Sequence, residues 1–140
     1  MEFRQEVNDI ASRDTTLGVL ANQIVSSYDN GNYMTCFFGI SVLVKNALRQ
    51  TTDFEGRMDH QEVQDAVVKL IQNGTIDDTD GNNIISMSLL NDFAQSEDMH
   101  APALLGEEKV IDFNSEEIWK QMVEQFISQM IPICKKLICR

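Results

Sequence analysis

The residues best suited to chemistry are the carboxylates and amides clustered between residues 76 and 86, in the segment IDDTDGNNIIS. Several oxygen donors around a glycine resemble a calcium-binding loop, because calcium is coordinated by many oxygen atoms arranged on a tight turn. If the segment 77–83 is such a loop, binding of a divalent ion would act as a switch. The candidate ligands are Asp78, Asp80 and Asn82.

The register of this cluster fits an EF-hand loop poorly. When Gly81 takes the sixth position, Ile76 and Met87 fall at the first and twelfth positions, where carboxylates are required. An Asp-Gly turn, which joins two short strands in many hairpins, explains the same residues without an ion. The sequence therefore predicts no metal centre and no cofactor, and the ion switch is kept as an alternative hypothesis.

Histidine and cysteine offer no catalytic arrangement either. His60 follows a helix cap and is expected to be solvated, and His100 has no second histidine or cysteine near it in the sequence. Cys36 lies among aromatic residues and is expected to be inert, whereas Cys134 and Cys139 each precede a basic residue that favours the reactive thiolate. The chain also lacks a serine nucleophile elbow and a glycine-rich phosphate loop. We therefore expect a protein that is not an enzyme.

The net charge is −11, and nearly all of the excess lies in the middle of the chain. Residues 53–124 contain 17 acids and 4 bases, while residues 125–140 contain 3 bases and no acid. Such a charge repels nucleic acid and anionic membranes, so neither is an expected partner. It favours a basic protein partner, although solubility alone also explains it.

No segment of the sequence has the pattern of a signal peptide or a membrane span. The N-terminal segment MEFRQEVNDI is too charged for a signal peptide. The most apolar run, residues 36–44, is far shorter than the roughly 20 residues of a transmembrane helix. The cysteines show no paired framework, which favours a reducing compartment. We expect a cytoplasmic protein.

Hydrophobic periodicity predicts an all-α fold, because apolar residues recur at helical spacing through most of the chain. We expect a single compact bundle of five or six helices that covers residues 1–140 as one domain, with at most a small β element near 75–85 and 109–113. Residues 36–44 are apolar on every side and also permit a buried strand, but the polar face that follows resumes in helical phase. The expected helices are residues 1–12, 15–28, 33–50, 59–72, 86–94 and 114–140.

Residues 114–140 form the longest amphipathic stretch and the expected scaffold of the fold. Asn114 and Glu117 make a capping-box pattern at its start. Pro132 lies on the polar side, and the apolar stripe continues past it in phase. This pattern predicts one kinked helix, with a break into two helices as the alternative.

These observations predict a protein-binding module, such as an adaptor, a chaperone or an inhibitor. Its partner would place a basic or amphipathic helical segment in an apolar groove between helices, flanked by acidic surface. An alternative is an acidic decoy that imitates nucleic acid, which requires the carboxylates of residues 53–124 to form a regular array on one face. Homo-oligomerisation through the terminal helix is a further option. The expected partner-binding residues are Trp119, Met122, Phe126 and Met130.

Overall fold

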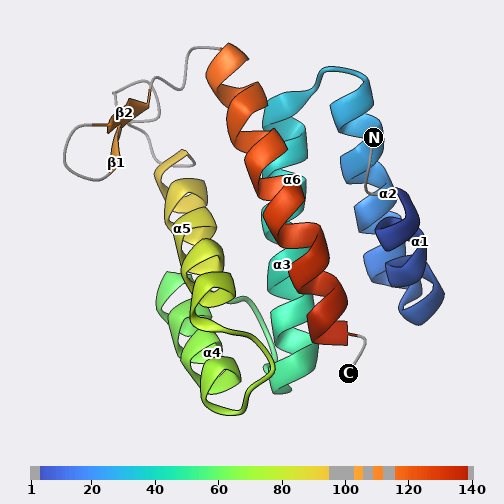
Figure 1. The fold of residues 1–140 in the computed structure, drawn as a ribbon, viewed down its shortest axis with the longest axis vertical. Helices are drawn as coiled ribbons and strands as arrows, with labels where there is room; N and C mark the ends of the chain where they lie inside the picture. Colours follow the sequence, from blue (N-terminus) through green and yellow to red (C-terminus); the bar gives the residue numbers. More distant parts are fainter. Residues whose placement is uncertain (1–3, 95–102, 106–108, 112–115, 139–140) are drawn as a thin grey trace.

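The computed structural model describes residues 4–94, 103–105, 109–111 and 116–138 (Figure 1). Its elements are α1 (Arg4–Arg13), α2 (Thr15–Asp29), α3 (Tyr33–Thr52), α4 (His60–Gln72), α5 (Asp78–Ala94), β1 (Ala103–Leu105), β2 (Lys109–Ile111) and α6 (Glu116–Ile138). The helical bundle predicted from the sequence is confirmed. α6 lies across α3 at the centre, with α1 and α2 on one side and α4 and α5 on the other.

α1 and α2 form a closely packed helical pair. Asp14 separates them and caps α2, because its side chain accepts a hydrogen bond of 2.9 Å from the backbone N–H of Leu17. The two helices approach each other closely at Gly18, where a Cβ atom would lie 2.5 Å from Cα of Ala11. A side chain does not fit there, so this crossing depends on the glycine.

α3 runs through the middle of the protein and contacts α2, α4, α5 and α6. Its segment 36–44 is helical, so the strand alternative is wrong. Phe37, Ile40 and Leu43 each have 0 % of their surface exposed. Because helices surround α3 on several sides, this segment needs little polar surface of its own.

α4 begins and ends as the sequence predicts. Asp59 and Glu62 form the capping box, in which the N–H of Glu62 donates a 2.8 Å hydrogen bond to Oδ1 of Asp59. Gly74 follows the last turn with a φ of +80°, the left-handed conformation that glycine readily adopts at helix ends. Local sequence thus sets both ends of this helix.

α5 begins earlier than the sequence pattern predicts. Its first residue is Asp78 rather than residue 86. Asp77 caps the helix, because its Oδ1 atom accepts a hydrogen bond of 2.7 Å from the backbone N–H of Asp80. The sequence allows at most a small β element near residues 75–85, and none forms there, since most of these residues form the start of a helix.

Gly81 lies within α5 and not in a turn. A Cβ atom at this position would come within 2.6 Å of Cδ1 of Ile71 and 2.8 Å of Cγ1 of Val67, both on α4. The absence of a side chain therefore lets α4 and α5 pack closely. The Asp-Gly pair predicts a turn when the sequence is read alone, because the sequence does not show that α4 packs against this glycine.

β1 and β2 form a short antiparallel pair, with Leu104 opposite Val110. β2 lies within residues 109–113, where the sequence predicts a small β element. The other residues from 95 to 115 lie outside the described part of the chain, and these include His100 and the predicted cap Asn114.

α6 is one continuous helix with Pro132 inside it, so the alternative of two helices is wrong. Its apolar stripe is buried against the rest of the bundle. The rings of Trp119 and Phe126 have their centres 5.4 and 5.8 Å from that of Phe37 on α3. The predicted scaffold role of this helix therefore agrees with its packing.

Surface ion pairs connect α6 to the helices on both sides. Nζ of Lys135 lies 2.8 Å from Oδ2 of Asp9 on α1, and Nζ of Lys136 lies 2.7 Å from Oδ2 of Asp80 on α5. Exposed pairs of this kind contribute less than about 1 kcal/mol each. The buried core therefore supplies most of the stability that holds α6 in place.

Candidate functional site

An exposed apolar stripe runs along one side of α3. Met34, Phe38 and Val42 follow one another at a spacing of four residues, so they share a helix face. Met34 and Val42 are 40 % and 46 % exposed, while Phe38 packs partly against Trp119. Neighbouring helices cover other sides of α3 and leave this stripe open to solvent.

A cleft of about 210 Å³, here called the α3 cleft, opens beside this stripe. Its walls come from α3, from the loop after α3 and from α5, so three parts of the chain meet there. The described residues that line it include no carboxylate. They are Phe38, Ser41, Val42, Lys45, Asn46, Arg49, Arg57, Met58 and Asn91.

The least exposed lining residues of the α3 cleft are Ser41, Met58 and Asn91, which are 2 %, 3 % and 3 % exposed. Two of them are polar, in a position where buried polar groups normally have hydrogen-bond partners. The hydroxyl of Ser41 makes no hydrogen bond within the described part of the chain. This hydroxyl is therefore free to bind a group that enters the cleft.

Three cations surround the α3 cleft. Lys45 and Arg49 lie one turn apart on α3, and Arg57 comes from the following loop. The guanidinium of Arg49 is held in place by hydrogen bonds to the carbonyl oxygen of Gly56, at 2.8 Å, and to the side-chain oxygen of Asn46. Lys45 and Arg57 form no ion pair with any carboxylate that the structure describes. All charged residues among the described lining of the cleft are therefore basic, on a protein of net charge −11.

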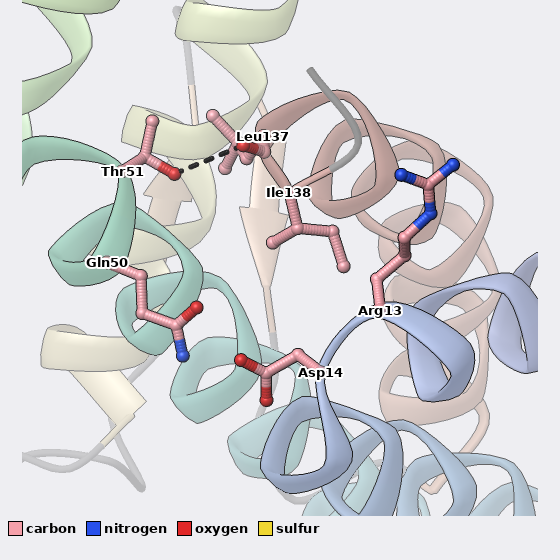
Figure 2. Close-up of a pocket in the computed structure, with 6 residues that line it drawn as sticks. All are labelled: Arg13, Asp14, Gln50, Thr51, Leu137 and Ile138. Carbon is pink, nitrogen blue, oxygen red and sulfur yellow. Dashed lines mark hydrogen bonds between the residues drawn. The ribbon is translucent and has the colours of Figure 1, made fainter.

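A second cleft, of about 290 Å³, lies where the corner between α1 and α2 meets the ends of α3 and α6 (Figure 2). Two of its polar side chains, those of Asp14 and Thr51, already have structural partners. Asp14 caps α2, and Oγ1 of Thr51 lies 2.7 Å from the carbonyl oxygen of Ala47 and 3.3 Å from that of Leu137. Because these groups hold helix ends together, we interpret this cleft as structural. The lining residues are Arg13, Asp14, Gln50, Thr51, Leu137 and Ile138.

No family model, curated protein or solved structure matches this chain. Among the helices that the structure describes, none is long and apolar enough to cross a membrane.

The four partner-binding residues predicted on the terminal helix all lie in the core. The exposed fraction is 4 % for Trp119, 7 % for Met122, 4 % for Phe126 and 0 % for Met130. An apolar stripe has the same pattern whether its own chain or a partner covers it. In this structure these side chains pack α6 onto the bundle, and a partner would reach them only if α6 moved away.

The candidate ion ligands do not surround a common point. Asp78, Asp80 and Asn82 lie in the first turns of α5, on a helix rather than in a loop. The carboxylate of Asp80 already pairs with the ammonium group of Lys136. Within the described residues, no group of three or more histidine, cysteine or acidic side chains is placed to hold a metal ion. The geometry thus gives no support to an ion switch at 77–83.

The two described thiols lie in the core. Burial raises the pKa of Cys36 and of Cys134 to about 12. Cys36 is buried, which agrees with the expected inert thiol, and its Sγ donates a 3.4 Å hydrogen bond to the carbonyl oxygen of Ile24. Cys134 precedes a basic residue in the sequence, but desolvation raises its pKa and so disfavours the reactive thiolate. Cys139 lies outside the described residues.

His60 is not the solvated residue that the sequence predicts. Its Nδ1 atom lies 3.0 Å from Oγ of Ser88, and its Nε2 atom lies 3.3 Å from Nε2 of Gln64. Ser88 is 0 % exposed, so its hydroxyl is closed to a substrate. The contact instead ties the start of α4 to α5.

The acidic residues lie at both ends of the bundle. Asp80 lies beside Lys136, near the C-terminal end of α6, whereas Glu116 and Glu117 lie in the first turn of the same helix. With a rise of 1.5 Å per residue, these two acidic positions are about 30 Å apart. Described carboxylates therefore occur near both ends of α6, and none of them lines the α3 cleft. The acidic decoy stays an alternative prediction.

Sequence reasoning missed the cations of the α3 cleft because it counted charge by segment. The acidic total of residues 53–124 concealed Arg57. The spacing of Lys45 and Arg49 beyond an apolar run was a usable signal for a basic helix face. No sequence pattern places Arg57 or Asn91 beside them, because these residues are brought there by the packing of the loop and of α5.

Proposed function

We propose that this protein is a non-catalytic binding module that holds a segment of a partner protein along α3. The observation that carries the proposal is the continuous surface formed by the stripe Met34, Phe38 and Val42 and the adjoining α3 cleft. An apolar stripe beside a cleft suits a partner helix, because side chains on one face of that helix can pack on the stripe and enter the cleft.

The other exposed apolar side chains support the choice of α3. Val19, Val68 and Leu89 are 53 %, 51 % and 52 % exposed, but each lies on a different helix. Single exposed apolar residues are common on protein surfaces and carry no functional meaning. On α3, by contrast, two such residues share a face with an aromatic ring and a cleft.

The proposal keeps the predicted class of protein and changes the expected chemistry of its surface. The sequence predicts an apolar groove with acidic flanks for a basic segment. The α3 cleft instead has Lys45, Arg49 and Arg57 around it. Adaptor, chaperone and inhibitor remain alternatives, since each would use the same surface.

A pair of matched variants tests the proposed surface. Val42→Asp places a charge on the stripe, whereas Val19→Asp places the same charge on an equally exposed valine of α2. Proteins captured from an extract of the native host are compared by quantitative mass spectrometry for wild type and both variants. We expect at least one partner to be depleted about tenfold by Val42→Asp and retained by Val19→Asp. If the two variants capture the same proteins in the same amounts, the α3 surface is not the binding site.

A further inference from the structure

We infer that the segment bound on α3 is acidic, with a carboxylate seated between Lys45, Arg49 and Arg57. The inference rests on the proposed function and names the chemistry of the partner. An amphipathic protein segment would lay apolar side chains on the stripe and direct one or more carboxylates into the α3 cleft.

The first argument is the lack of internal partners for the positive charges. Lys45 and Arg57 line a common cleft without an ion pair to any described carboxylate, although the protein has twice as many acids as bases, 22 against 11. Like charges gathered in one place repel one another, and an incoming anion removes that repulsion. Elsewhere on the surface, Arg4, Lys135 and Lys136 do pair with carboxylates.

The second argument is that part of the site is already ordered. The guanidinium of Arg49 is fixed by Gly56 and Asn46, so it loses little conformational freedom when a ligand binds. The same contact with Gly56 anchors the loop that carries Arg57. Charged groups held in position by other residues bind more strongly than mobile ones.

The third argument concerns the lining of the cleft. The hydroxyl of Ser41 can donate a hydrogen bond to one carboxylate oxygen while the cations approach the other. Phe38, Val42 and Met58 supply apolar walls. Less water beside these walls strengthens the charge-assisted hydrogen bonds of the bound carboxylate.

The size of the surface limits the partner to a short segment. Met34 and Arg49 are fifteen residues apart on α3, which corresponds to about 22 Å of helix. A helix of about four turns matches that length. Extended polyanions are less suitable, because the net charge of −11 repels a nucleic acid or an anionic membrane at long range. A few carboxylates on an apolar segment interact mainly with the nearby cations, since salt screens the more distant negative charges of the protein beyond about 8 Å.

Three helical peptides of about 16 residues, the length of the surface, test the inference. Each is alanine-based and carries two leucines at i and i+4. They differ only at i+8 and i+11 on the same face, where the residues are glutamate, glutamine or lysine. Amide chemical shifts of the ¹⁵N-labelled protein are followed in each titration. We expect the glutamate peptide to shift signals of residues 34–58 and to bind about tenfold more tightly than the glutamine peptide. The lysine peptide, which non-specific attraction to an acidic protein would favour, should bind weakest.

Charge-reversal variants provide the matched control. Lys45→Glu combined with Arg57→Glu should reverse the order, so that the lysine peptide binds most tightly. Arg13→Glu combined with Lys69→Glu changes the net charge by the same amount at sites outside the α3 cleft, and should leave the order unchanged.

The possible failures point to different conclusions. If the glutamine peptide binds at α3 as tightly as the glutamate peptide, the acidic inference is wrong and the proposed docking surface stands. If no peptide shifts the signals of α3, the docking surface itself is wrong. Binding of the protein to phosphatidylserine vesicles is measured as well. Binding to them that exceeds binding to the glutamate peptide, and that Lys45→Glu with Arg57→Glu abolishes, would show a lipid-binding site and overturn the inference.

Discussion

The guanidinium of Arg49 donates a hydrogen bond of 2.8 Å to the carbonyl oxygen of Gly56, and so joins the end of α3 to the loop that follows it. The backbone of Arg49 takes part as well, because its carbonyl oxygen accepts a 3.0 Å hydrogen bond from the N–H of Phe54. The turn between them uses positive φ angles at Asp53 and Gly56. One side chain therefore contributes to the fold of the loop and to the position of Arg57.

Removal of the Arg49 guanidinium should loosen this loop. Arg49→Met keeps much of the aliphatic stem but loses the hydrogen bonds to Gly56 and Asn46. We expect the free energy of unfolding to fall by about 1 kcal/mol, since the contacts are largely exposed. Urea denaturation gives the value. Lys45→Met removes the same charge from the same helix without a described ion pair, and should change the free energy by less than about 0.5 kcal/mol. Equal losses in both variants would contradict a structural role for Arg49.

Gly18 should not tolerate a side chain. A Cβ atom there would lie 2.5 Å from Cα of Ala11, and backbone cannot move aside cheaply. We expect Gly18→Ala to destabilise the protein by about 2 kcal/mol in urea denaturation, because α1 and α2 must separate.

Gly39→Ala is the control for this prediction. At this helical glycine, the nearest atom is Cγ1 of Ile24 at 3.1 Å, which can shift slightly. Alanine also favours helix by up to about 1 kcal/mol, so the net effect should be near zero. A neutral Gly18→Ala would show that the two helices do not cross as closely as the structure has them.

Tyr28 should make the protein lose stability at high pH. Its hydroxyl donates a 2.8 Å hydrogen bond to Oε1 of Glu124, and this bond, followed by partial burial, raises the pKa of Tyr28 to about 12. The unfolded phenol ionises from its ordinary pKa of about 10. Between these two values the unfolded state binds fewer protons than the folded state, so the free energy of unfolding falls as pH rises.

Two measurements check this prediction. Ultraviolet titration of the phenolate should show one of the two tyrosines with a pKa near 12, and Glu124→Gln should lower that pKa. Tyr28→Phe should remove part of the alkaline loss of stability that wild type shows in urea denaturation. If Glu124→Gln leaves both tyrosine titrations unchanged, the hydrogen bond is not the cause of the shift.

Cys36 and Cys134 should resist alkylation in the folded protein. Their raised pKa of about 12 reduces the thiolate fraction at mildly alkaline pH by about a thousandfold relative to an ordinary thiol, and burial blocks the reagent as well. Peptide mapping after treatment with iodoacetamide should find both unmodified. The same treatment in urea should label both completely. Labelling of Cys134 at equal rates in the two conditions would place it at the surface.

Much of the fold follows from local sequence because helix ends and buried stripes are short-range features. The Asp59 and Glu62 capping box and the glycine stop at Gly74 both use contacts within one turn. Gly81 follows an aspartate and therefore predicts a turn, but it lies in a helix. A glycine is needed there because Ile71 and Val67 on α4 leave no room for a side chain. A pattern that reports only on its own segment cannot separate these two uses of glycine.

The candidate site depends even more than the helices do on contacts between distant parts of the chain. The apolar periodicity of α3 and the one-turn spacing of Lys45 and Arg49 can be read from the sequence alone, because helical spacing is local. The sequence also predicts the buried stripe of α6, but not what covers it. The folded structure is needed to see that α6 is covered by its own chain and that Arg57 and Asn91 lie beside α3. The physical reason is that these contacts depend on how loops close and helices pack, which involve residues far apart in the chain.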